Sequence, residues 1–554
     1  MAVLAQKSVA SLMRNTLDRQ AANARMKFVL KPKQVEQILT SYVRDRNSGP
    51  YFELLKVLKD FPLNDNNFRK LMDDSLNCVV LLEKEMKPYV EAMCNIQWIN
   101  RSQDLVELYK RFLLNLVTAH TYHCPRILSN LIKLFRTDGD NWDDRPPQEM
   151  LMSWSNVHSA IAEIVALMPL TSDLVLQAIV DQFPYYKAGC VVNRTYIHNL
   201  IWITKYIPSL REPIMTAIVN RMVDMDANLV EQEKNKQDTM FEMEVDAKDD
   251  VRDTLDYCML EMLRWLEDER DPALNSLCNV FERVLLPTHG IRHVQFLLLY
   301  TTSISQQCAD HVFTNLWAVA AGLHDMRPGA VATRRTAASH LAGLLARCVR
   351  VPNSRLIHYL RLMSEWCHSY IAASQDTVND NNKVHGAFYA ICHAIFYLVA
   401  FKNHHLFMSK ESLNFVESLN LPRLVTCSLN PLRTCPPQVT QAFSSVTRSH
   451  QVVYCQAIIE KNMRLSLHNQ LPYDEWFPYD PYTLPISGKI IWPLCMEYKD
   501  LLKEGDDETQ YSSLKRKLDA EDDDYLMASP SMKLASSLTN YTSPGFKTSE
   551  SIII

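Results

Sequence analysis

Glycine is scarce in this chain, and the scarcity limits what the chain can fold into. The 554 residues include 11 glycines, whereas an average protein contains about 7% glycine. The closest pair, Gly322 and Gly329, is seven positions apart. Loops that hold phosphate groups need two or more glycines within a few residues, and so does the G-x-S-x-G turn of hydrolases. The sequence therefore excludes both kinds of loop and favours long helices joined by short polar or proline-containing turns.

Apolar residues recur at the three- and four-residue spacing of a helix face along most of the chain. The clearest helical segments are residues 105–117, 157–168, 255–266, 274–285, 337–349, 356–371 and 388–400. No segment alternates with a period of two, so we expect little or no sheet. The sequence predicts an all-α protein.

Prolines follow several of these apolar runs, namely Pro169, Pro184, Pro208, Pro287, Pro352 and Pro422. The residue before a proline is pushed out of the α region, so we expect a helix end at each of them. Helices arranged in pairs at intervals of about 35–45 residues indicate a HEAT-like or armadillo-like α-solenoid with degenerate repeats. Stacked pairs share one core and leave an extended outer surface, which suits protein binding better than an enclosed catalytic pocket.

Changes in composition divide the chain into five predicted regions. They are a basic N-terminal arm (1–34), N-terminal helical repeats (35–226), an acidic linker (227–253), C-terminal helical repeats (254–502) and a serine-rich acidic tail (503–554). Residues 231–253 contain nine acids and four bases with few large apolar residues, which is typical of a solvated linker or insertion. The tail is too polar to bury enough surface to become ordered, so we expect disorder there.

Two segments allow more than one interpretation. Residues 1–35 contain one acid, Asp18, among seven bases. This pattern resembles a mitochondrial presequence, although we favour a basic, partly helical arm. Residues 384–401 contain no charged side chain and reach the length of a marginal membrane span. Their apolar residues form a helical stripe, which favours a buried helix and no membrane contact.

The fourteen cysteines are spread singly, and no C-x-x-C pair occurs. We expect reduced, mostly buried cysteines in a cytosolic or nuclear protein. His120, His123 and Cys124 are close enough to share a metal, but no further ligand lies nearby. His289 and His293 lack the glutamate of H-E-x-x-H. We therefore expect structural roles for all five residues, and neither a metal nor another cofactor.

Enzymatic activity is not expected. Catalytic residues meet in space and not in sequence, so no triad can be assigned, and the lack of strands removes most hydrolase scaffolds. The net charge of −5 argues against a wide surface for nucleic-acid phosphates, although a local basic patch remains an alternative. A binding protein is the better interpretation.

Hydroxyl residues gather on two neighbouring predicted helical pairs, and they are Ser102, Ser129, Ser153, Ser155, Ser159, Thr171 and Ser172. Helix capping and ordinary polar faces explain most such residues. If several share one stacked face, they form a polar, uncharged patch that packs closely against a partner. A phosphate added there would oppose that contact through its charge and its desolvation.

The tail contains two candidate features of another kind. Lys515, Arg516 and Lys517 are adjacent bases, which suit nuclear import or form an ordinary charge cluster. The two Ser-Pro pairs of the chain begin at Ser529 and Ser543, and their place in accessible backbone makes them phosphorylation candidates.

Six short strings, in this order, resemble the RNA polymerase I-specific transcription initiation factor family. They are residues 100–103 (NRSQ), 196–212 (YIHNLIWITKYIPSLRE), 286–296 (LPTHGIRHVQF), 385–389 (HGAFY), 429–432 (LNPL) and 477–482 (FPYDPY). The similarity covers roughly residues 52–501, which is nearly the whole predicted folded part. Each string is short, but together they are quite specific.

This resemblance implies a HEAT-repeat protein without catalytic activity that acts in the nucleus and nucleolus. Family members bind RNA polymerase I, make it initiation-competent and bridge it to the promoter-bound selectivity factor at ribosomal RNA genes. A serine-containing surface in the N-terminal half contacts the polymerase, and protein kinases regulate the contact, which maps the surface onto the seven hydroxyl residues. The family's acidic insertion corresponds to residues 138–144, which is much shorter here.

Three other functions remain open at this point. A helical-repeat adaptor in nuclear transport or ribosome assembly would share the same fold and composition. A mitochondrial protein with a cleaved arm would explain the basic N-terminus. Direct DNA binding would require the local basic patch, and we expect any DNA contact to be indirect or weak.

Overall fold

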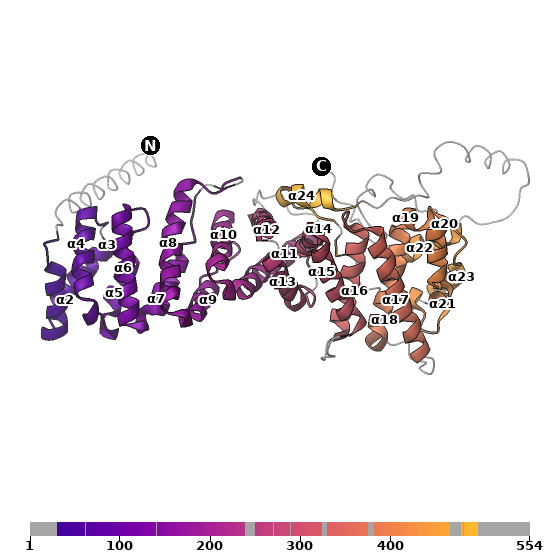
Figure 1. The fold of residues 1–554 in the computed structure, drawn as a ribbon, viewed down its shortest axis with the longest axis horizontal. Coiled ribbons are helices and arrows are strands. Elements are labelled where there is room, and N and C mark those ends of the chain that lie inside the picture. Colours follow the sequence, from indigo (N-terminus) through magenta and orange to yellow (C-terminus); the bar gives the residue numbers. More distant parts are fainter. Residues whose placement is uncertain are drawn as a thin grey trace, which may run out of the picture. The chain divides into compact units, whose positions relative to one another are not determined.

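The computed structural model describes residues 30–60, 62–139, 141–143, 145–238, 250–269, 271–288, 290–323, 330–374, 382–465, 478–479 and 481–496. These residues contain helices and no strand, and a single isolated β-bridge pairs Cys348 with Cys495. The predicted all-α fold is confirmed. The contacts divide the chain into two compact units, Met1–Ala217 and Ile218–Ile554, which are described separately below (Figure 1).

The N-terminal unit is a stack of helices in two layers (Figure 1). Helices α4, α6, α8 and α10 pack in chain order as one layer, and α3, α5, α7 and α9 pack as the other. The α-helices are α2 (Gln34–Asp45), α3 (Ser48–Asp60), α4 (Asp65–Asn77), α5 (Lys87–Cys94), α6 (Gln103–Ala119), α7 (Cys124–Lys133), α8 (Gln148–Leu167), α9 (Ser172–Asp181) and α10 (Cys190–Tyr206). This pairing is the solenoid arrangement that the spacing of the apolar runs predicts.

The same turn follows α6, α8 and α10. The residue after each helix has φ between −137° and −124° and ψ between 77° and 83°. A 3-10 turn comes next, and these turns are η3 (Thr121–His123), η4 (Pro169–Thr171) and η5 (Pro208–Leu210). His120 Nε2 is 2.8 Å from the carbonyl oxygen of Val79, and His123 Nε2 is 3.0 Å from that of Leu82. Both histidines therefore connect neighbouring turns.

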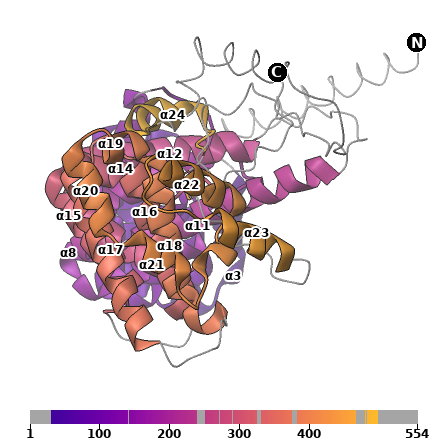
Figure 2. The same cartoon turned by 90° about the vertical axis from the view of Figure 1, so that its right-hand side faces the viewer.

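The C-terminal unit is built around α18 (Asn382–Phe401), which contacts α16, α17 and α22 (Figure 2). The other helices of its second half are α16 (Ala330–Arg347), α17 (Asn353–Ala373), α19 (Asn403–Phe407), α20 (Lys410–Ser418), α21 (Leu421–Thr426), η7 (Pro431–Arg433), α22 (Pro437–Ser449) and α23 (Gln456–Leu465). The segment Val384–Phe401 is long and apolar enough to cross a membrane, but 94% of it is buried within the fold. The predicted buried helix is confirmed, because this helix is the core of its unit.

Before α16, the chain forms α12 (Asp250–Glu269), α13 (Asp271–Val280), the π-helical turn η6 (Phe281–Leu285), α14 (Phe296–Ile304) and α15 (Gln306–Ala321). Helix α11 (Arg211–Asp238) runs across the division between the two units. Of the predicted acidic linker, residues 227–238 belong to α11 and residues 250–253 to α12. The basic arm up to residue 29 and the tail lie outside the described residues, and so do Lys515, Arg516, Lys517, Ser529 and Ser543.

A C-terminal strap, residues 478–479 and 481–496, crosses the helices of this unit. It contains α24 (Pro485–Ile491) and η8 (Trp492–Leu494), which contact α12 and α14. Gln295 Nε2 donates to the carbonyl oxygen of Pro478 at 2.6 Å, and the rings of Phe296 and Tyr482 lie 4.6 Å apart. The strap thereby brings together two strings, 286–296 and 477–482, that are almost 200 positions apart.

Prolines do mark helix ends, with one correction. Helix α8 ends just before the Met168-Pro169 pair, and α10 ends just before Ile207-Pro208. Pro422 instead lies in the first turn of α21, so the expectation that it closes a helix is wrong. The first helical turn has no intrahelical partner for an N–H, which is why proline is tolerated there.

The cysteines behave as small apolar residues. All fourteen lie in the described part of the chain and none forms a disulfide; eleven of them are buried. Burial raises the pKa of several thiols, among them Cys78, Cys94 and Cys124, each to about 11. Such thiols stay protonated and unreactive at neutral pH.

Candidate functional site

Four of the seven candidate hydroxyl residues lie on the layer formed by α6 and α8. Ser153, Ser155 and Ser159 belong to α8, and Ser102 is the residue before α6. Ser102 and Ser155 are exposed, whereas Ser153 and Ser159 are partly exposed. We call Ser102, Ser153, Ser155 and Ser159 the α6–α8 serine face.

One end of the serine face joins α8 to the loop before α6. The hydroxyl of Ser153 is 2.6 Å from Asn100 Oδ1 and also donates to the carbonyl oxygen of Glu149 at 2.8 Å. Asn156 Nδ2 donates to the carbonyl oxygen of Ile99 at 3.0 Å. The string 100–103 therefore lies directly against α8, beside Ser153.

A buried lysine on α6, Lys110, pairs with two carboxylates beside Ser159. Lys110 Nζ lies 2.7 Å from Glu163 Oε1 and 3.1 Å from Glu107 Oε1, and its side chain is 6% exposed. Burial disfavours the charged ammonium, but the hydrogen bonds that it donates to the carboxylates of Glu163 and Glu107 outweigh this effect and raise the pKa of Lys110. Ser159 donates to Glu163 Oε1 at 2.9 Å. The patch around Ser159 is therefore polar and charged, whereas the sequence suggested an uncharged one.

The other three hydroxyl residues lie elsewhere in the N-terminal unit. Ser129 on α7 accepts a hydrogen bond from Gln182 Nε2 at 3.0 Å, in the second layer. Thr171 is buried in η4, where its hydroxyl donates to the carbonyl oxygen of Met168. Ser172, the first residue of α9, donates to the carbonyl oxygen of Pro169. The structure thus does not bring these three onto the serine face.

A fully buried arginine holds the short acidic loop that precedes α8. Arg194 on α10 donates from Nη1 to Asn141 Oδ1 at 2.6 Å and to the carbonyl oxygen of Trp142. Its Nη2 donates to the carbonyl oxygen of Asp143 at 3.2 Å, and its guanidinium lies 4.1 Å from the ring of Trp142. Nothing in the sequence distinguishes Arg194 from a surface arginine, so its role becomes visible only in the structure.

The anchored loop packs against the buried side of α8. The ring of Trp142 contacts that of Trp154, with centroids 6.1 Å apart, and both rings are buried. This contact fixes the loop to α8. The described acidic residues of the loop are Asp138 and Asp143.

Buried contacts fix α8 against α10. His158 on α8 bonds through Nδ1 to the hydroxyl of Tyr206 at 2.9 Å and through Nε2 to Asn199 Oδ1 at 3.0 Å. Burial lowers the pKa of His158 to about 3, so the ring is neutral at physiological pH. Both partners belong to the string 196–212, which thus forms the support behind the serine face.

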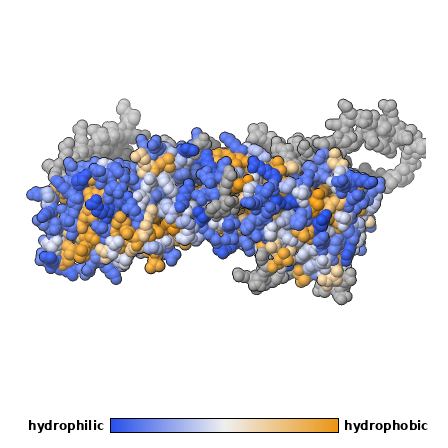
Figure 3. Space-filling model, in the orientation of Figure 1, coloured by the Kyte–Doolittle hydropathy of each residue, from blue (hydrophilic) through white to orange (hydrophobic). Residues whose placement is uncertain are grey.

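Apolar side chains also reach the surface of this unit. Figure 3 shows hydrophobic patches among the polar residues of the N-terminal unit on the face drawn. Met152 on α8 is 64% exposed, and Leu170 in η4 is 92% exposed. No group of three or more histidine, cysteine or acidic side chains suited to a metal occurs within the described ranges. Exposed polar and apolar side chains thus lie together on the surface of this helical stack.

Comparisons with known proteins agree with one another. A family model described as "RNA polymerase I specific transcription initiation factor RRN3" matches residues 26–261 and 230–503. The mouse protein named RNA polymerase I-specific transcription initiation factor RRN3 is 28% identical over 89% of this chain and 84% of its own length. The fission yeast protein named rrn3 is 24% identical over 79% of this chain and 80% of its length.

A solved structure resembles the fold of the chain. The crystal structure of RNA polymerase I transcription initiation factor Rrn3 superposes with a TM-score of 0.68 at 16% sequence identity. The match covers 84% of this chain and 99% of the other.

Proposed function

Because the chain belongs to the RNA polymerase I-specific transcription initiation factor RRN3 family, we propose that it binds RNA polymerase I through the α6–α8 serine face. The binding makes the polymerase competent to initiate on ribosomal RNA genes. The observation that carries this proposal is the contact of Ser153 with Asn100. This contact joins a candidate serine of α8 to the string 100–103 and so supports a continuous docking surface across α6 and α8.

The physical basis of binding is a preorganised surface. Lys110, His158 and Arg194 fix the neighbouring helices and the loop, so little conformational entropy is lost when a partner docks. The exposed hydroxyls of Ser102 and Ser155 add hydrogen-bonding groups without the desolvation cost of a full charge.

Phosphorylation regulates this contact in the proposed mechanism. A phosphate on Ser153 or Ser155 adds about −1.5 to −2 charges and must be desolvated in a closed interface. A phosphate in a desolvated interface costs roughly a few kcal/mol, and about 1.4 kcal/mol weakens binding tenfold, so one phosphate lowers the affinity for the polymerase at least tenfold.

We also propose how the factor reaches the promoter and how its tail acts. The factor bridges the polymerase to the promoter-bound selectivity factor, and DNA contact is indirect or weak. Lys515, Arg516 and Lys517 direct nuclear import, and the protein works in the nucleolus. Ser529 and Ser543 in the tail are further kinase substrates. The relatives are initiation factors rather than enzymes, and we propose no catalytic activity.

The test is co-purification of RNA polymerase I with glutamate variants. We expect Ser153→Glu to lower the recovered polymerase at least tenfold while helicity measured by circular dichroism stays unchanged. Ser172→Glu tests the wider patch, because Ser172 lies off the serine face, at the first residue of α9. Ser369→Glu is the matched control, since Ser369 is exposed on α17 and also bonds to the carbonyl four residues earlier.

Two results would remove the serine face from the proposal. Undiminished polymerase recovery by Ser153→Glu and Ser155→Glu is the first. The second is mass spectrometry that returns a GTPase and import cargo in place of polymerase subunits, which would favour the alternative of a nuclear-transport or ribosome-assembly adaptor.

A further inference from the structure

An isolated β-bridge places two cysteines opposite each other in the C-terminal unit. Cys348 directly follows α16, and Cys495 directly follows η8 near the end of the strap. The N–H after each cysteine donates to the carbonyl oxygen of the residue before the other one, at 2.9 Å and 2.6 Å. Because these hydrogen bonds join the flanking residues, Cys348 and Cys495 form a non-hydrogen-bonded antiparallel pair.

This backbone pairing suits a disulfide. A non-hydrogen-bonded antiparallel pair holds its Cα atoms about 4.5 Å apart, and its two side chains lie on the same face of the ladder. Disulfides join Cα atoms that are about 4.4–6.8 Å apart. The strap therefore holds Cys495 at a separation from Cys348 that an S–S bond spans.

A buried cation lies beside Cys348. Lys402 directly follows α18 and is 4% exposed, and its Nζ lies 3.2 Å from Sδ of Met496, the neighbour of Cys495 in the chain. Burial lowers the pKa of Lys402 to about 8, and the negative charge of a Cys348 thiolate opposes this effect. Among the residues that the structure describes, Lys402 has no carboxylate partner. A nearby ammonium stabilises a thiolate, which is the reactive form of cysteine.

The two thiols differ in their access to solvent. Cys348 is fully buried, and the hydroxyl of Thr302 lies 3.7 Å from its Sγ. Cys495 is partly exposed. A small molecule therefore reaches Cys495 first, and Cys348 lies behind it in the position of a resolving thiol.

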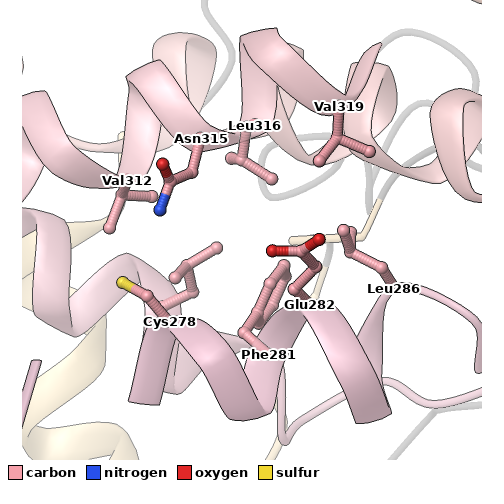
Figure 4. Close-up of a pocket in the computed structure, with 9 residues that line it drawn as sticks. Cys278, Phe281, Glu282, Leu286, Val312, Asn315, Leu316 and Val319 are labelled. Atoms are coloured by element: carbon pink, nitrogen blue, oxygen red, sulfur yellow. The ribbon is translucent and has the colours of Figure 1, made fainter. Parts of the chain in front are cut away.

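Two other cysteine sites lack this combination of a facing thiol, a cation and access. Figure 4 shows Cys278 beside a small gap between η6 and α15, and no lysine or arginine lines that gap. Burial raises the pKa of Cys278 to about 12, so its thiol stays protonated. The sulfur atoms of Cys367 and Cys392 are 3.7 Å apart, but both residues are fully buried, and burial raises the pKa of Cys392 well above its usual value.

We propose that Cys348 and Cys495 form a reversible disulfide by exchange with a small-molecule disulfide. The Cys495 thiolate attacks one sulfur of that molecule and releases the other as a thiol, which leaves a mixed disulfide on Cys495. The Cys348 thiolate then attacks the Cys495 sulfur and releases the second thiol. Two protons and two electrons thus pass from the cysteines to the small molecule.

The new bond ties the strap to α16 and closes a loop of about 150 residues. In a reducing compartment such a bond forms when the supply of oxidised thiols rises, so it responds to oxidative conditions. The site lies in the C-terminal unit and does not depend on the proposed polymerase contact.

The test exposes the full-length protein to glutathione disulfide, blocks the remaining thiols with N-ethylmaleimide and maps disulfides by mass spectrometry of a tryptic digest. We expect residues 348–350 to be linked to residues 490–499, and the link to disappear after reduction. The urea midpoint of the oxidised chain should lie about 1 M above that of the reduced chain. Cys348→Ser should accumulate glutathione on Cys495, because the resolving thiol is missing.

Two further variants complete the test. Cys495→Ser removes the partly exposed thiol and should abolish both the linked peptides and the shift of the urea midpoint. Cys190→Ser is the matched control, since Cys190 is also partly exposed but lies in the N-terminal unit, and it should behave like the native chain. Absence of the linked peptides, stable glutathione on Cys495 of the native chain, or a link from Cys495 to another cysteine would overturn the proposal. An unchanged urea midpoint of the linked chain would overturn the fixing of the strap.

Discussion

The ring of Tyr479 lies directly on the backbone of α16 at Gly343. A Cβ atom at position 343 would be 2.6 Å from Cδ2 of Tyr479, which is closer than real atoms approach. Tyr479 is buried, and its hydroxyl is 3.0 Å from His340 Nδ1. A glycine inside a helix usually costs about 0.5–1 kcal/mol relative to alanine. The lack of a side chain at position 343 lets the C-terminal strap lie directly against the helix there.

We therefore expect Gly343→Ala to destabilise the C-terminal unit by about 1–3 kcal/mol, since the added methyl forces the strap away from α16. Urea unfolding followed by circular dichroism measures the change. Gly49→Ala is the matched control, because no atom lies within 4 Å of a Cβ built there. That control should be neutral or stabilising by up to about 1 kcal/mol. A stabilised Gly343→Ala variant would show that Tyr479 does not pack on α16.

A second prediction concerns the buried carboxylate that holds the other end of the strap. Asp256 accepts hydrogen bonds from the N–H groups of Ile486 and Ser487, both at 2.7 Å, and from the hydroxyl of Ser487. Asp256→Asn replaces one acceptor oxygen by a donor and should cost on the order of 2–3 kcal/mol.

Limited trypsin digestion detects the released strap. Lys489 lies in α24 and is exposed, so the variant should be cut there several times faster than the native chain. Asp224→Asn is the control, because Asp224 is largely exposed and only weakly paired with Arg221 at 3.8 Å. Equal cleavage rates of native chain and Asp256→Asn would contradict the role of Asp256.

The helices were predictable from local pattern. The apolar stripe at residues 105–117 lies within α6, and that at 157–168 lies within α8 and its cap residue Met168. Periodicity and proline are local signals, and helix formation depends mainly on them. Pro422 differs because a proline can precede or open a helix as well as end one, and the sequence does not say which.

The site was only partly predictable. Ser153, Ser155 and Ser159 belong to α8 and Ser102 directly precedes α6. That these two helices are neighbours follows from the repeat pattern. The partners of Lys110 and Arg194 depend on which residues meet across helices 50 or more positions apart. The sequence pattern also includes Thr171 among the candidate contact residues, but the structure shows that its side chain is buried in η4. Burial of a polar side chain is decided by tertiary packing, which one sequence does not reveal.

A third prediction follows from the buried guanidinium of Arg194. Arg194→Met keeps the length of the side chain but leaves the carbonyl oxygens of Trp142 and Asp143 without their donor, which should cost about 2–3 kcal/mol. The loop should detach from α10, and the fluorescence of Trp142 should shift to longer wavelength. Because the loop packs on α8, which carries the proposed polymerase contact, polymerase recovery should fall as well.

The control for this variant is Arg126→Met. Arg126 is half-exposed and pairs with Glu91 at 3.6 Å, so its loss should change stability by less than about 1 kcal/mol. An unchanged emission spectrum for Arg194→Met would show that the guanidinium does not hold the loop.

The last prediction is a loss of stability in acid that comes from buried neutral histidines. Burial lowers the pKa of His340 and His393 in the C-terminal unit, each to about 3. Above pH 6.5 both rings are neutral in the folded and the unfolded chain, and stability is complete. Below pH 6.5 the unfolded chain binds protons that the folded chain does not, so stability falls by about 1.4 kcal/mol per pH unit for each histidine.

At pH 5.0 each of these histidines should therefore have removed about 2 kcal/mol from the free energy of unfolding. His340→Asn cannot bind the proton, so its loss of stability between pH 7.5 and 5.0 should be about 2 kcal/mol smaller than that of the native chain. The comparison uses the difference between the two pH values, because the variant also loses the bond to Tyr479 and starts from a lower stability. His404→Asn, at an exposed position, should follow the native chain. An identical drop for His340→Asn and the native chain would mean that His340 takes up its proton in the folded protein, which its complete burial against Phe281 and Tyr479 opposes.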